Sequence, residues 1–152
     1  MPEKFRLHSV LRLRMNHQQE RQAELAQAVQ AIQMVQDQMK EVKQELSEIE
    51  TELRSAATHH VNVDHLMAVR RHQTERRGVL RQLEEQEHLV EQEIERRQIK
   101  LREANREVKV IETLEQHHRA AQVAQMLKRE QETLDEFAQK RVGMDFGGYE
   151  GT

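Results

Sequence analysis

The feature that most constrains this sequence is the near absence of residues that end helices. Pro2 is the only proline, and Gly78 is the only glycine between Glu3 and Val142. A compact domain needs glycine and proline at its turns, so this chain is expected to form long, uninterrupted helices. The composition agrees, because 34% of the residues are charged and only 3% are aromatic, which leaves little material for a globular core.

The charge balance and the residue types argue against several classes of function. Twenty-four basic and 27 acidic residues give a net charge of −3, which is too even to indicate nucleic acid or a membrane surface as partner. No stretch approaches 18 apolar residues and the N-terminus has no apolar signal segment, so neither a membrane span nor secretion is indicated. Since cysteine is absent, disulfides and thiolate chemistry are excluded.

Apolar residues in the first half of the chain recur at alternating spacings of three and four, as in the seam of a coiled coil. Further toward the N-terminus the same spacing meets Arg14, Gln18 and Arg21. A first helix is therefore predicted over residues 4–57, with a seam that is polar in its middle. Its predicted core positions are Ile32, Val35, Met39, Val42, Leu46 and Leu53.

The pattern stops at residues 58–63, where β-branched and Asx residues disfavour a helix interior and predict a turn. Either Asn62 or Asp64 could cap the helix that follows. This second helix is predicted over residues 64–141, and residues 143–152 are expected to form a disordered tail because they are rich in glycine. Its predicted core positions are Val69, Leu80, Leu83, Val90 and Ile94, with polar insertions at Gln73, Arg76, Glu87 and Arg97.

The two seams fit each other if the chain folds back near residue 61. Facing residues then have numbers that sum to 122, as for Met39 with Leu83. Residues 41–52 carry five glutamates and their mirror, 70–81, carries five arginines, which suits antiparallel flanks. The fold class predicted is all-α, an antiparallel coiled-coil hairpin forming a single domain over residues 1–142. The alternative is a parallel dimer, in which each charged block would face its own copy.

The second helix is the longer one and overhangs the first from Gln116 to Arg141. The overhang is still amphipathic, and an apolar stripe that nothing in the same chain covers is a candidate docking surface. The alternative is that the stripe is covered by dimerisation. The stripe consists of Ala120, Val123, Leu127, Leu134 and Phe137.

Motifs for catalysis and for metal binding are absent or weak. The sequence has no phosphate-binding glycine loop, no nucleophile elbow and no zinc-protease helix signature. His59, His60, His65 and His72 gather around the turn, but without cysteine or a pocket we expect only incidental metal affinity. We therefore expect no enzymatic activity, no catalytic residues, no metal site and no cofactor.

Two segments resemble the FliJ family, the coiled-coil component of the flagellar type III export apparatus. These are Lys4–Arg14 near the start and Leu134–Lys140 near the end. The resemblance implies a non-enzymatic, stalk-like protein that binds and stimulates the export ATPase ring, contacts the export gate membrane protein and escorts export chaperones. It also implies a cytoplasmic location, peripherally associated with the inner-membrane export apparatus.

The resemblance also assigns residues to the end that would meet the ATPase, while the gate-contacting residues stay unassigned. Leu127 joins this set because it lies on the uncovered stripe. The alternative function is a structural or adaptor coiled coil of another assembly, including a homodimeric one. By position, the residues at the ATPase end are Phe5, Leu7, Val10 and Leu11, with Leu134, Asp135, Glu136, Phe137 and Ala138.

Overall fold

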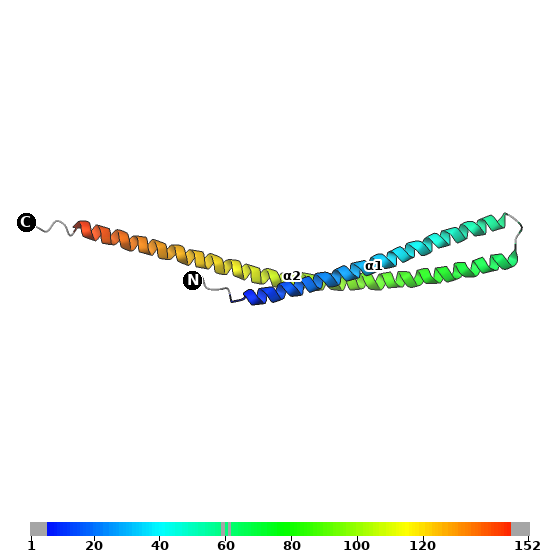
Figure 1. Ribbon diagram of the computed structural model, residues 1–152, viewed down its shortest axis with the longest axis horizontal. Helices are drawn as coiled ribbons and strands as arrows, with labels where there is room; N and C mark the ends of the chain where they lie inside the picture. The colour runs from blue at the N-terminus through cyan, green and yellow to red at the C-terminus, as the bar shows by residue number, and fades with distance from the viewer. Residues whose placement is uncertain (1–5, 59, 61, 147–152) are drawn as a thin grey trace, which may run out of the picture. The chain divides into compact units, whose positions relative to one another are not determined.

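The computed structural model describes residues 6–58, 60 and 62–146, and all regular structure within them is helical. Helix α1 spans His8–Ala57 and helix α2 spans Val63–Phe146 (Figure 1). The helices pack against each other and the second is the longer, so the predicted all-α coiled-coil fold is confirmed. No helix in the described ranges is long and apolar enough to cross a membrane.

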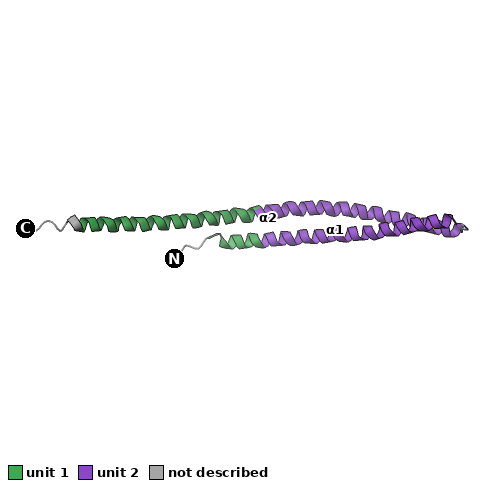
Figure 2. Ribbon diagram, turned by 90° about the horizontal axis from the view of Figure 1, so that it is seen from above, with its two compact units in different colours: residues 1–15, 106–152 green, residues 16–105 purple. Residues whose placement is uncertain are grey.

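The chain divides into two compact units, which Figure 2 shows in different colours. Unit 2 contains residues 16–105, and unit 1 contains residues 1–15 together with residues 106–152. Each unit has its own part of α1 packed on its own part of α2. The single domain predicted over residues 1–142 stays a prediction.

The predicted register is confirmed in unit 2, where α1 and α2 lie side by side (Figure 1). Met39, Val42 and Leu83 form one buried cluster, and Leu80 packs against it. The predicted register, in which Met39 faces Leu83 and Val42 faces Leu80 with numbers that sum to 122, brings these four residues together, as observed. All the predicted core positions are buried or half-buried, and Ala28, Ile49 and Ala104 are buried as well.

Unit 1 contains a second, smaller cluster. Leu11 of α1 is buried against Val108 and Ile111 of α2, and Val10 packs beside them. Arg14 donates from Nη1 to Oε2 of Glu107 over 2.9 Å, next to this cluster. Among the described residues of unit 1, the pairing of α1 and α2 therefore depends on a few apolar contacts and one exposed ion pair.

Asn62 caps the start of α2, which resolves the two alternatives left by the sequence. Its Oδ1 accepts hydrogen bonds from the backbone N–H groups of Asp64, at 3.2 Å, and His65, at 3.5 Å. These are two of the donors that a helix start leaves without a partner. The carboxylate of Asp64 lies in the first turn, where it interacts favourably with the helix dipole.

The predicted helix bounds need correction at three points. Helix α1 begins at His8 rather than residue 4; Arg6 and Leu7 form a turn, and the first helical turn has no acidic residue to stabilise it. Helix α2 begins at Val63, directly after its cap. It also continues past Arg141 to Phe146, because a single glycine, Gly143, costs a helix only about 1 kcal/mol relative to alanine. Of the tail, residues 147–152 lie outside the described residues.

One carboxylate in unit 2 sits among several positive charges. Arg21 donates from Nη1 to Oε2 of Glu24 over 2.9 Å, and Arg97 donates to the backbone oxygen of Glu24. The hydrogen bond from Arg21 is the main reason that the pKa of Glu24 lies below its ordinary value; slight burial opposes it, and the charges of Arg21, Lys100 and Arg97 lower it further. The ionised form of Glu24 is therefore favoured in the folded chain.

We predict that cysteines replacing Val42 and Leu80 form a disulfide within one chain under mild oxidation. The two side chains belong to one packed cluster in the observed register, so their Cβ atoms are expected to lie within bridging reach. Non-reducing electrophoresis and intact mass measure the product. Cross-linking only between chains would contradict the antiparallel hairpin.

We predict that Arg21→Gln raises the pKa of Glu24 toward its ordinary value, as measured by NMR titration of the Glu24 carboxyl group. The folded pKa is depressed, so the stability it contributes is present at neutral pH and is lost as the pH falls through the folded pKa. Arg12→Gln, at an exposed position on the same helix, serves as the control and should leave the titration unchanged.

Candidate partner-binding surface

The most exposed apolar surface of unit 1 lies on α2, beyond the residues that pack against α1. We call this surface the C-terminal stripe: Ala120, Val123, Leu127, Leu134 and Phe137. Val123 is 56% exposed, Leu127 60%, and Leu134 and Phe137 68% each. These side chains are exposed because α1 does not reach them: within unit 1 the α2 part continues well past the end of the α1 part (Figure 2).

The C-terminal stripe is not a continuation of the seam. Continuing the seam from Ile111 by steps of four, three and four reaches Glu115, His118 and Gln122, and these polar residues are half-buried. With 3.6 residues per turn, the stripe is rotated by roughly 100° about the α2 axis relative to Val108 and Ile111. A partner on the stripe would therefore contact a different face of α2 from the one that α1 occupies.

The stripe is also wider than the heptad spacing indicates. Met126 and Val142 are 58% and 56% exposed and are further apolar side chains on this part of the helix. The sequence analysis missed both because it followed one line of residues and did not count their neighbours. Since Ala124 and Ala138 add small side chains on the same part of α2, a partner could approach the backbone closely there.

The structure places the other predicted ATPase-end residues in three different environments. Asp135, Glu136 and Ala138 are exposed, and so is Leu7 at 37%. Val10 is half-buried and Leu11 is buried in the unit 1 cluster, so in this structure both contribute to helix pairing. Phe5 lies outside the described residues. The assignment of all these residues to a partner stays a prediction.

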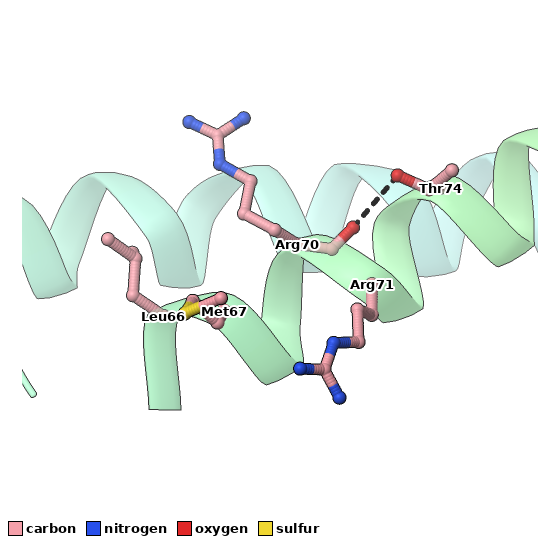
Figure 3. A pocket seen from close by; sticks show the side chains of 5 residues that line it. All are labelled: Leu66, Met67, Arg70, Arg71 and Thr74. Atoms are coloured by element: carbon pink, nitrogen blue, oxygen red, sulfur yellow. Dashed lines mark hydrogen bonds between the residues drawn. The ribbon is translucent and has the colours of Figure 1, made fainter. Parts of the chain in front are cut away.

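One surface depression near the start of α2 shows no arrangement suited to catalysis. It has a volume of about 420 Å³ and is lined by Leu66, Met67, Arg70, Arg71 and Thr74. Figure 3 shows the two arginine side chains pointing away from each other, and the Thr74 hydroxyl donates to the backbone oxygen of Arg70 over 3.0 Å. These polar groups do not converge, and none of the lining residues can act as a carboxylate or imidazole base.

The described histidines near the turn, His60, His65 and His72, are not part of a metal-binding group. Nε2 of His65 lies 3.2 Å from Oε1 of Glu52, an exposed contact between the two helices. Within the described ranges, no group of three or more histidine, aspartate or glutamate side chains could hold a metal ion. His59 lies outside those ranges.

These features define the class of the protein: a long two-helix coiled coil with an uncovered apolar surface suited to protein partners. A search of protein-family models finds a match to the flagellar FliJ protein over residues 3–144, which is most of the chain. The chain belongs to the FliJ family of coiled-coil proteins of the flagellar export apparatus, a family of non-catalytic export proteins. The resemblance seen in the sequence is thereby confirmed.

Neither a search of curated proteins nor a search of solved structures finds a match.

We predict that Leu134→Asp with Phe137→Asp leaves the helix content and the melting temperature nearly unchanged, because both side chains are exposed. The matched control is Val108→Asp, which places a charge at a buried seam position and should cost about 2–4 kcal/mol of stability. Circular dichroism melts measure both. If the double variant loses as much helix as the control, then the stripe is structural and not a free surface.

Proposed function

We propose that this chain binds the export ATPase ring through the C-terminal stripe and stimulates it, acting as a non-enzymatic stalk of the flagellar export apparatus. The family supplies the setting, and the resemblance supplies the expected partner. The observation that carries the proposal is the set of four large apolar side chains on α2, each more than half exposed. An apolar surface of this kind marks a site of protein association.

The beginning of the chain supports the proposal through its charge. Arg6 and Arg12 are exposed in unit 1, whereas Arg14 is paired with Glu107. Exposed positive charge in the same unit as an apolar docking surface can guide the protein toward an acidic opening and raise the rate of association. Arg6 and Arg12 are therefore proposed to steer the encounter and the stripe to supply the affinity.

The pattern of the stripe argues against a second copy as its occupant. If two stripes paired antiparallel with Val123 facing Leu134, the residue facing Leu127 would be Glu130. In a parallel pair, Glu130 would face its own copy in the middle of the contact. Each arrangement places glutamates in the seam, so a different protein whose groove accommodates Glu130 fits this surface better.

The remaining expectations extend the proposal to other partners. We include contact with the export gate membrane protein and escort of export chaperones, and with them a cytoplasmic location at the inner-membrane export apparatus. These follow from the family resemblance, and no residues of this chain are assigned to them. The homodimeric adaptor of another assembly is the alternative that the experiment below must separate from this proposal.

The test is the ATPase rate of the organism's own export ATPase with and without an equimolar amount of this protein. We expect stimulation, accompanied by ring assembly in light scattering and by co-elution in size exclusion. Leu134→Asp with Phe137→Asp should weaken binding by more than about tenfold, as expected for the loss of the two most exposed apolar contacts of the stripe.

The matched control is Met34→Asp with Leu89→Asp, which replaces two equally exposed apolar residues of unit 2. It should leave stimulation intact. Absence of both stimulation and co-elution would refute the ATPase proposal, and a stable dimer in a mass measurement would then favour the adaptor.

A further inference from the structure

We call each pair of facing seam residues, one from α1 and one from α2, a layer. Three consecutive layers of the unit 2 seam each contain one polar residue. No other part of the described seam of unit 2 has so long a run, and the next longest is the pair of layers at Gln73 and Arg76. In the observed register the three layers are Gln18 with Ala104, Arg21 with Leu101, and Leu25 with Arg97.

Little apolar surface is buried along these layers. From residue 16 to residue 27, α1 contains no buried hydrophobic residue. On α2, Leu101 is only half-buried, and Ala104 is buried but contributes a single methyl group. By contrast, Met39, Val42 and Leu83 are buried together farther along the same unit. Separation of the helices at the three polar layers therefore exposes less new apolar area to water than separation at that cluster.

The charged groups of these layers keep their partners when the helices part. Arg21 is paired with Glu24 on its own helix, with 2.9 Å between Nη1 and Oε2. Arg97 is paired with Glu93 on its own helix, with 3.0 Å between Nε and Oε1. Because neither pair crosses between α1 and α2, separation leaves no charge without a counterion.

Separation breaks two hydrogen bonds between the helices and weakens the attraction of Lys100 and Arg97 for Glu24. Gln18 donates from Nε2 to Oδ1 of Asn105 over 2.6 Å, and Arg97 donates to the backbone oxygen of Glu24. Water can replace both partners, since the atoms lie near the surface of a two-helix pair. Near the turn the situation differs, because the pair between Arg76 and Glu45, at 3.3 Å, does cross between the helices.

We propose that these three layers form an opening site, where α1 and α2 separate locally while the Met39, Val42 and Leu83 cluster stays packed. The site is built from intrahelical ion pairs in place of interhelical ones, so its closed form is held by few contacts. This property belongs to the chain itself and does not depend on which partner binds the C-terminal stripe.

Hydrogen–deuterium exchange of the full chain tests the proposal. Amides of residues 18–25 and 97–104 should exchange about tenfold faster, or more, than amides of residues 35–46 and 80–87. Equal protection of these segments would overturn the proposal.

A variant separates the opening site from ordinary fraying. Gln18→Leu with Arg21→Leu makes two of the layers apolar and should slow exchange in residues 18–25 by about tenfold. The control is Gln19→Leu with Arg102→Leu, the same residue changes at exposed positions of unit 2, which should leave exchange unchanged. Absence of slowing, or equal slowing in both variants, contradicts the opening site.

An engineered disulfide between the helices, which can be formed and reduced, gives an independent test of the opening. Cysteines replacing Gln18 and Ala104 face each other in the observed register, and their disulfide should slow exchange in residues 97–104. Reduction should restore the fast exchange. If the oxidised and reduced proteins exchange alike, then the layers do not open and the inference fails.

Discussion

Both units depend on a seam only two helices wide, in which each polar residue of one helix faces an apolar residue of the other. In the observed register Gln73 faces Ile49 and Glu87 faces Val35, while Gln18 of the first helix faces Ala104 of the second. Gln73 is nevertheless buried, at 7% exposed. A long polar side chain can lie over an apolar neighbour and keep a polar partner, as Gln73 does by accepting a hydrogen bond from Nη1 of Arg70 over 3.4 Å.

This layering selects the partner of each helix. If α1 paired in parallel with a second α1, Arg21 would face Arg21, and a parallel pair of α2 helices would bring Arg76 and Arg97 each against its own copy. Like charges in a coiled-coil core are costly, whereas the hairpin places none of them together. A seam this narrow completely buries no side chain in the described residues, so stability is spread along its length. Pairing specificity therefore comes from the order of the layers more than from any one contact.

The sequence was sufficient to predict most of this fold, for a physical reason. Alternating spacings of three and four and the absence of glycine and proline act locally, and the start of α2 after the fold-back is fixed by the cap at Asn62. The helix ends were harder. Whether a helix frays at Leu7 or continues through Gly143 depends on differences of about 1 kcal/mol, which a pattern of residue types does not resolve.

The candidate surface was predictable in part. Leu127, Leu134 and Phe137 could be found because they repeat at heptad spacing where no first helix remains to cover them. Leu11 carried two predictions: the family resemblance assigns it to the ATPase end, whereas the register places it opposite Ile111, and the structure buries it against Val108 and Ile111. Burial of that kind depends on which residue of a distant segment arrives opposite, and it requires the register of both helices together.

The seam and the C-terminal stripe lie on different faces of α2, so pairing with α1 and the proposed binding of a partner do not compete for one face. A helix that used one face for both pairing and docking would have to release α1 before it could bind a partner on that face. Here Val108 and Ile111 hold α1, and Leu127 and Leu134 lie roughly 100° away around the same helix. The exposed end of α2 remains helical through good helix formers such as Ala120 and Ala121, without needing the seam. Pairing and the proposed docking therefore use different faces of this helix, so variants on either face are expected to alter one and leave the other in place.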